Sequence, residues 1–156
     1  EDTGAFTDYV FPDGMISVNL EENFGNDVNG SQGQHPGTDS PGAASLVSMG
    51  EANGFDGSSP FAPESYDAAA VIMLAMQSAG SSSSADYASK VMEVANAPGV
   101  QIFPGELAKG LKILADGGDI DYVGGSAVEL IGPGESAGAY RQIEIKDGKI
   151  TTMQYR

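Results

Sequence analysis

Residues 61–80 read Phe-Ala-Pro-Glu-Ser-Tyr-Asp-Ala-Ala-Ala-Val-Ile-Met-Leu-Ala-Met-Gln-Ser-Ala-Gly, and this stretch carries the clearest structural signal in the chain. It predicts a helix over residues 64–79, because Pro63 and the Glu-Ser pair after it suit a helix start. The alanine, leucine and methionine that follow have high helix propensity. Gly80 and the serine run 81–84 end the helix, as glycine and serine do just past a C-terminus.

Working outward from this helix, apolar residues at helical spacing predict four more helices: residues 1–14, 41–51, 85–96 and 105–115. Asp2 or Thr3 can cap the first of them. Pairs that contain glycine follow the other three and stop them.

Short apolar or alternating runs predict strands at residues 15–20, 120–123, 127–131, 139–145 and 150–155. Between the last two, Asp147-Gly148 is the dipeptide of a type I′ hairpin turn. Residues 21–40 are rich in asparagine and glycine without any period and are predicted as a loop, which at that length is usually functional or mobile. The chain is thus predicted to have an α/β fold.

The charge of the chain is strongly negative and uneven. Seven Lys and Arg stand against 22 Asp and Glu, the net charge is −15, and the first basic residue is Lys90. This surface repels phosphate backbones and anionic lipids, so we expect no nucleic-acid binding. No apolar run approaches the roughly 20 residues of a membrane span, so direct membrane insertion is not expected. The absence of cysteine excludes disulfides and thiolate metal sites.

Several motifs occur in a recognisable order. Residues 66–68 (Tyr-Asp-Ala) open the alanine-rich helix, residues 119–126 read Asp-Ile-Asp-Tyr-Val-Gly-Gly-Ser, and an acidic glycine turn at 132–138 precedes the 147–148 hairpin. This order resembles the type I periplasmic solute-binding proteins of ABC importers, in the leucine/isoleucine/valine-binding (receptor-family ligand-binding) branch. One departure is Ala127, which stands where the family usually has a second glycine, and another is the long loop at 21–40.

The resemblance implies two α/β lobes joined by three crossovers, with the ligand bound in the cleft between them. It covers nearly the whole chain but only the C-terminal part of a family member, so a partial periplasmic-binding-protein type I fold ending in a hairpin is expected. Residues 1–40 would belong to the second lobe, residues 41–126 mainly to first-lobe helices, and residues 127–156 to returning strands and the hairpin.

The same resemblance suggests ligand-binding residues. In the family an acid just after a second-lobe strand, in a motif like (D/E)G…F, holds the ligand ammonium, and residues 1–6 (Glu-Asp-Thr-Gly-Ala-Phe) resemble it. Asp2 is the expected ammonium ligand, with Glu1 as the alternative, and Tyr66 is a further candidate. The plainer interpretations are that Asp2 only caps a helix, that Tyr66 is a packed aromatic and that Asp67 compensates the helix dipole.

Other polar residues carry weaker signals. His35, the single histidine, is predicted to be a solvated loop residue, because no partner of fixed geometry lies near it in the sequence. Residues 27–31 place oxygen ligands at alternate positions but lack the glycine and glutamate of a calcium loop. No nucleotide-loop spacing occurs, so neither a cofactor nor a metal is expected.

These observations predict a substrate-binding component of an ABC importer for branched-chain or related amino acids or amides. It would work in the periplasm, would not be an enzyme, and would deliver its small zwitterionic ligand to a membrane permease. The alternatives are an extracellular sensing domain of the same fold, a metal-dependent hydrolase, or a structural or adhesive secreted domain. Self-association of the fragment through exposed strand edges would give a homo-oligomer.

Overall fold

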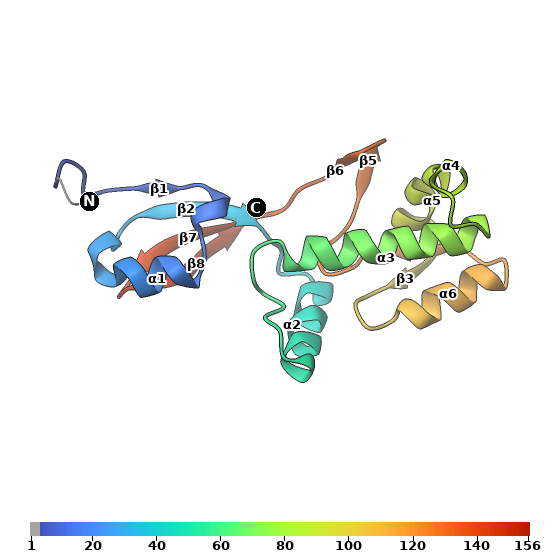
Figure 1. Cartoon of the computed structure of the whole chain (residues 1–156), viewed down its shortest axis with the longest axis horizontal. Coiled ribbons are helices and arrows are strands. Elements are labelled where there is room, and N and C mark those ends of the chain that lie inside the picture. Colours follow the sequence, from blue (N-terminus) through green and yellow to red (C-terminus); the bar gives the residue numbers. More distant parts are fainter. Residues whose placement is uncertain (1–3) are drawn as a thin grey trace. The chain divides into compact units, whose positions relative to one another are not determined.

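The computed structural model describes residues 4–156. The chain divides into two units, each with its own helices and strands (Figure 1). Unit 1 combines the residues up to Thr38 with Ala139–Arg156, and unit 2 is the continuous segment Asp39–Gly138. Unit 1 is therefore assembled from two stretches that lie far apart in the sequence.

Unit 1 contains a four-stranded sheet, in the order β1 (Val10–Phe11), β2 (Gln32–Pro36), β7 (Tyr140–Lys146) and β8 (Lys149–Tyr155). β1 runs parallel to β2, whereas β7 is antiparallel to both β2 and β8. Asp147 (φ 53°) and Gly148 (φ 74°) connect β7 to β8, and these two positive angles confirm the predicted type I′ turn.

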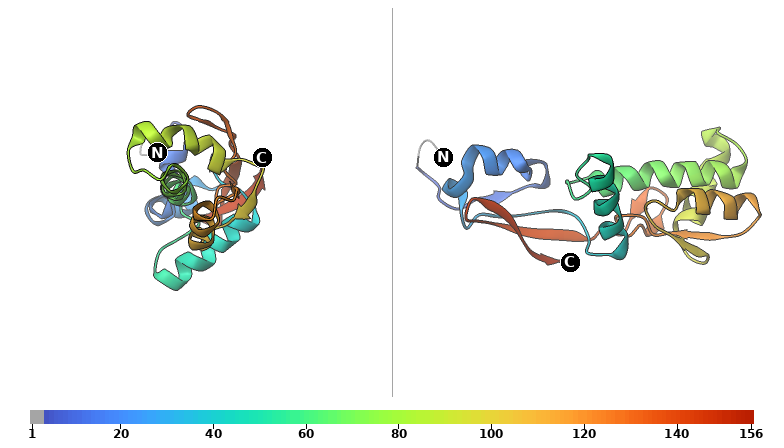
Figure 2. Two further views of the ribbon diagram at one scale, coloured as in Figure 1. Left: turned by 90° about the vertical axis from the view of Figure 1, so that its right-hand side faces the viewer. Right: turned by 90° about the horizontal axis from the view of Figure 1, so that it is seen from below.

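One short helix covers a face of this sheet. After the 3₁₀ helix Asp13–Met15, α1 (Val18–Phe24) and the 3₁₀ helix Gly25–Val28 lie against the sheet (Figure 2). The core between them consists of buried Phe11, Ile16, Leu20, Val28, Ile143 and Ile145. Glu21 ties α1 to the hairpin, because its carboxylate accepts from Ile150 N (2.8 Å) and from Lys149 Nζ (2.8 Å).

Unit 2 is organised around α3 (Ala62–Ala79). Helices α5 (Val91–Ala95) and α6 (Leu107–Ala115) pack against α3, and β3 (Val100–Ile102) pairs in parallel with β4 (Ile120–Tyr122). The buried core comprises Ala70, Val71, Leu74, Ala75, Val94, Ala95, Ile102, Ile120 and Tyr122. The remaining elements are α2 (Pro41–Asn53), α4 (Ser84–Tyr87), the 3₁₀ helix Ala88–Lys90, β5 (Leu130–Gly132) and β6 (Glu135–Ser136).

Two sequence predictions for the N-terminal region are wrong. The run 15–20 is not a strand but the end of a 3₁₀ helix and the start of α1. Its buried residues, Ile16 and Leu20, are four positions apart while Val18 is 60% exposed, so burial follows a helical period. Within residues 4–14 the structure has β1 and a 3₁₀ helix in place of the predicted helix.

The predicted loop 21–40 contains most of α1 and all of β2. β2 escaped prediction because its sequence is Gln-Gly-Gln-His-Pro, with no alternation of apolar residues. A Cβ at Gly33 would lie 2.8 Å from the Phe11 carbonyl oxygen, so glycine permits the close approach of β1. His35 is therefore not a solvated loop residue: it is 3% exposed in β2, with Nδ1 2.6 Å from the Pro36 carbonyl oxygen.

Smaller corrections concern unit 2. The predicted helix 85–96 is three short pieces, namely α4, the 3₁₀ helix Ala88–Lys90 and α5. Strand β3 was not predicted, and the strand expected at 127–131 begins only at Leu130.

Candidate functional site

The parallel strands β3 and β4 end at the same edge of unit 2. Ile102 is in register with Tyr122, so the segments that follow both strands, 103–106 and 123–128, leave from this edge. The amides of Val123 and Gly124 both donate to the Ile102 carbonyl oxygen, at 3.1 and 3.2 Å. In α/β folds ligands bind outside the carboxyl ends of parallel strands, which makes this edge the first place to examine.

A buried carboxylate organises the edge. Asp67, in the first turns of α3, is only 2% exposed. Its Oδ1 accepts from Tyr122 Oη (2.9 Å) and Gly125 N (2.9 Å), and its Oδ2 accepts from Ser126 N (2.7 Å) and Ser126 Oγ (2.6 Å). Four donors thus compensate the desolvation of the charge.

The residues around Asp67 fit this role. Burial, and then the negative charge of Asp67, raise the pKa of Tyr122 above its usual value, so its hydroxyl stays a neutral donor. A Cβ on Gly124 (φ 60°) would collide with the Asp67 carboxylate, so glycine is required there. Asp67 therefore pins the segment after β4 to α3, which is a larger role than compensating the helix dipole.

Tyr66 forms a hydrogen bond with the segment that follows β3 at this edge. Its side chain is half-buried against the core, and its hydroxyl accepts a hydrogen bond from Gly105 N (3.2 Å), in the connection between β3 and α6. The packed-aromatic interpretation describes this geometry, and ligand contact by Tyr66 stays a prediction.

Two residues of unit 2 other than glycine have left-handed backbone angles. Phe61, just before α3, has φ 67° and is 41% exposed, and Ala127 has φ 56°. Such angles are uncommon for residues other than glycine and often mark functional positions. Phe61 is not among the residues predicted for the site, because no signal in the sequence distinguishes its backbone.

Unit 1 offers a second candidate position. β1 and β2 are parallel, and Pro36 at the end of β2 is in register with Tyr140 at the start of β7, so the chain leaves and re-enters unit 1 at the carboxyl edge of β1 and β2. Asp13 is the first acid after β1, is exposed, and accepts from Gly14 N (2.6 Å). Its Asp-Gly sequence was overlooked because the strand was predicted on the wrong side of it.

The predicted ligand residues Asp2 and Glu1 lie outside the described residues. Their role as ligand residues stays a prediction. Among residues 4–156 no group of three or more metal-ligating side chains gathers. No helix in this described range has the length and apolar character needed to cross a membrane.

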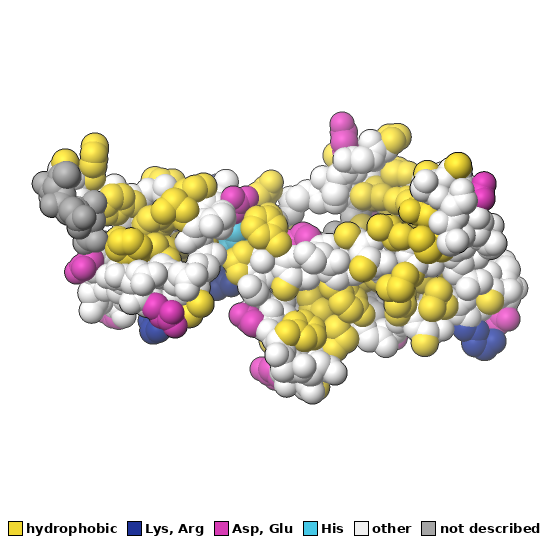
Figure 3. All heavy atoms as spheres, in the orientation of Figure 1, with side chains coloured by type: hydrophobic (Ala, Val, Ile, Leu, Met, Phe, Trp, Pro, Cys, Tyr) yellow, Lys and Arg dark blue, Asp and Glu magenta, His cyan; other side chains and the backbone are white. Residues whose placement is uncertain are grey.

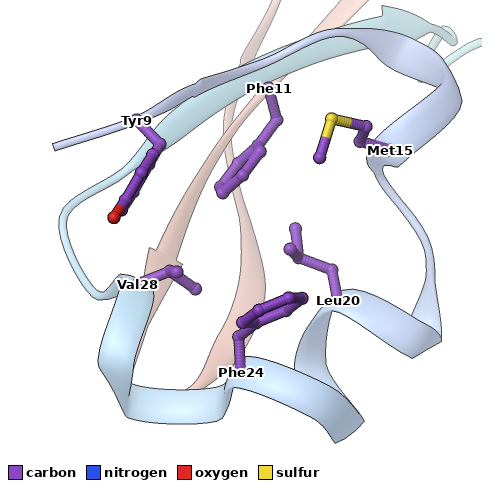
Figure 4. A pocket seen from close by; sticks show the side chains of 6 residues that line it. All are labelled: Tyr9, Phe11, Met15, Leu20, Phe24 and Val28. Carbon is purple, nitrogen blue, oxygen red and sulfur yellow. The ribbon is translucent and has the colours of Figure 1, made fainter. Parts of the chain in front are cut away.

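Unit 1 also contains an apolar pocket of about 180 Å³ between β1 and α1. Six side chains converge on it in Figure 4: Tyr9, Phe11, Met15, Leu20, Phe24 and Val28. This lining offers apolar contact but almost no hydrogen bonds, so it suits an apolar group and not a zwitterion.

Comparison with known proteins gives a likeness of fold. No family model matches the chain, and no curated protein matches its sequence. The crystal structure of a leucine-binding protein from Thermotoga maritima superposes with a TM-score of 0.68 at 17% sequence identity. The match covers 99% of this chain and 39% of that chain.

This likeness confirms the predicted fold class: the chain has a mixed α/β fold that matches part of a periplasmic-binding-protein type I fold. The chain spans about two fifths of the length of the solved structure. By its description that protein is a leucine-binding protein. At this identity the likeness is one of fold.

Proposed function

We propose that this chain is the C-terminal part of the substrate-binding component of an ABC transporter. In this proposal it works in the periplasm, binds a branched-chain or related amino acid or amide between two lobes, and delivers it to a membrane permease. The observation that carries the proposal is the likeness of 99% of the chain to a leucine-binding protein. We assign unit 1 to the second lobe and unit 2 to the first.

The positions of the connections support this assignment. The chain passes between the units only at the carboxyl edge of β1 and β2, and unit 2 has its own carboxyl edge after β3 and β4. In α/β folds, ligands bind outside the carboxyl ends of the strands, where backbone amides and loop side chains contact them. Closure of the lobes around the ligand would then present the closed form to the permease.

Asp13 is our candidate for the residue that holds the ligand ammonium. The resemblance calls for an acid followed by glycine just after a second-lobe strand, and Asp13-Gly14 follows β1 after a single proline. A carboxylate suits this task because an ammonium removed from water needs a charged acceptor. Glu1 and Asp2 remain the alternatives from the sequence.

Thermal unfolding with added ligands tests the proposal on the protein that the complete reading frame encodes. A ligand that binds only the native state raises the melting temperature by mass action. We expect a rise with leucine or a related amino acid and none with Mg²⁺, Mn²⁺ or Zn²⁺. A rise with a divalent cation alone would favour the metal-dependent hydrolase, and no rise with any amino acid would contradict the proposal.

The role of Asp13 has a matched control. Asp8 is also exposed, but it precedes β1 and so lies toward the other end of that strand. Asp13→Asn should weaken the binding of the amino acid roughly tenfold to a hundredfold, because it removes a charge-assisted hydrogen bond. Asp8→Asn should leave the affinity unchanged, and equal losses in both variants would overturn the assignment.

A further inference from the structure

Helix α3 is apolar on every side over half its length. The nine residues from Ala68 to Met76 are all alanine, valine, isoleucine, leucine or methionine. One side packs on the core of unit 2 through buried Ala70, Val71, Leu74 and Ala75. A helix that is hydrophobic all round is normally covered all round, so the opposite side needs an explanation.

That opposite side is open in the described structure. It carries Ala68, Ala69, Ile72 and Met73, which we call the apolar stripe; all four are exposed, Ile72 to 41% and Met73 to 43%. Figure 3 shows hydrophobic side chains gathered over the region of α3. Contiguous exposed apolar surface of this kind marks an interaction site.

A groove of about 360 Å³ borders the stripe. Ala68 and Ile72 line it together with Val91 and Leu130. Glu64 lines it as well, and its Oε2 is buried with no hydrogen-bond donor among the described residues. Because buried acceptors normally have donors, the groove lacks a polar partner as well as an apolar cover.

The neighbouring sheet is also incomplete. β3 and β4 form a parallel pair of three residues each, and in the described part of unit 2 no third strand joins them. Parallel sheets occur almost only with several strands and with both faces covered. The β3–β4 pair therefore lacks the neighbouring strands, and α3 the covering layer, that such elements normally have.

We propose that the apolar stripe and its groove are the docking surface for a polypeptide segment that completes the α/β layers of unit 2. The occupant is the portion of the fold that the leucine-binding protein has and this chain lacks, since the match covers 39% of that protein. It precedes this chain in the reading frame, presents apolar side chains to Ile72 and Met73, and supplies a donor to Glu64. The inference rests on the proposed function, which assigns unit 2 to one lobe of a larger protein.

Charge argues against a second copy of the chain as the occupant. Unit 2 carries thirteen acidic and three basic side chains between Asp39 and Gly138. Two such units facing each other would repel, since like charges across an interface suppress association. A segment of neutral or positive charge meets no such barrier.

Co-expression tests the docking surface. The segment encoded upstream of Glu1 is produced as a tagged polypeptide together with this untagged chain, and the retained chain is quantified. We expect a one-to-one complex, and Ala69→Glu or Ile72→Glu should lower retention roughly tenfold or more, because each buries a charge in an apolar interface. Ala108→Glu, on the exposed side of α6, is the matched control and should retain the wild-type amount.

Several results would overturn the inference: a reading frame with no upstream segment, no retention, or retention that Ile72→Glu leaves unchanged. A homodimer of this chain that Ile72→Glu dissociates would identify a second copy as the occupant and overturn it too. Complex formation is measured in the absence of added amino acids. A complex that binds no amino acid would therefore contradict the proposed function but not the docking surface.

Discussion

At the scale of single residues, the carboxylate of Asp67 has the largest structural consequence. All its four partners donate to it, and two of them are backbone amides whose direction is fixed: Gly125 N faces Oδ1 and Ser126 N faces Oδ2. In Asp67→Asn the amide NH₂ must face one of these N–H groups in either orientation. The substitution therefore leaves one buried backbone N–H group facing the NH₂ of the new amide, with no acceptor between them.

We expect Asp67→Asn to lower the free energy of unfolding by roughly 2–3 kcal/mol, the cost of a buried unsatisfied group and a lost charged acceptor. Tyr122→Phe should cost about 1 kcal/mol, since it removes one donor of four. Urea denaturation measures both, with Glu51→Gln on the exposed side of α2 as the control. A loss for Asp67→Asn no larger than for Glu51→Gln would contradict this role.

Ala127 gives a prediction of the opposite sign. Its φ of 56° lies in the left-handed region, which is unfavourable for alanine and free for glycine. Ala127→Gly should raise the free energy of unfolding by about 0.5–1 kcal/mol, after the greater entropy of glycine in the unfolded chain is deducted. The same denaturation experiment checks it, and a loss of stability would show that the backbone angle costs alanine little.

At the scale of elements, Glu21 holds α1 to the β7–β8 hairpin. The hydrogen bond from Lys149, and then that from Ile150 N, lower the pKa of Glu21 below its usual 4.5. A lowered pKa means that the contact stabilises the folded state above about pH 4.5 and is lost as the pH falls through the folded-state value. The Lys149 side chain is 72% exposed, so solvent screens this ion pair and its contribution to stability is small.

Glu21→Gln should accordingly lower the melting temperature at pH 7, and the difference from the wild type should shrink as the pH falls below about 4.5. Glu22→Gln is the matched control, because Glu22 is the adjacent exposed acid on α1. A difference that stays constant between pH 7 and pH 3 would contradict the ionised contact.

The elements also show how much of the secondary structure can be predicted from the sequence alone. Helix α3 and the Asp147-Gly148 turn were predicted correctly because propensity, end signals and turn chemistry agree there. β2 was missed because its polar sequence has no hydrophobic period, although tertiary pairing with β7 makes it a strand. The break between α4 and α5 was missed because Tyr87, Val91 and Val94 keep helical spacing across it.

The candidate site was less predictable than the elements. The position of Asp13 depends on where β1 ends, and the predicted strand 15–20 follows Asp13, whereas the observed strand β1 precedes it. The left-handed angle of Phe61 is not indicated by its residue type, since phenylalanine rarely adopts this backbone conformation. Tyr66 and Asp67 were singled out from the motif, yet their roles in bracing the edge appear only with Gly105 and Ser126 in place.

At the scale of the whole molecule, three features fit the proposal that the chain is part of a larger solute-binding protein. They are the likeness of fold, the carboxyl edge in each unit, and the uncovered apolar side of α3. The chain has the topology of part of a leucine-binding protein, with 39% of that protein matched. The exposed stripe of α3 is what a lobe would show when part of its layers is absent. A self-contained domain of this length would be expected to bury such a helix on both sides.

The most direct test is a ¹H–¹⁵N NMR titration of the protein encoded by the complete reading frame with L-leucine. The amide signals of Gly14, Phe61 and Gly125, at the ends of the strands or at the start of α3, should shift saturably. Those of Lys149, at the other end of the sheet on β8, and Lys112, on α6, should not. Shifts confined to Phe11, Leu20 and Phe24 of the apolar pocket, or no shifts at millimolar leucine, would contradict solute binding at the carboxyl edges.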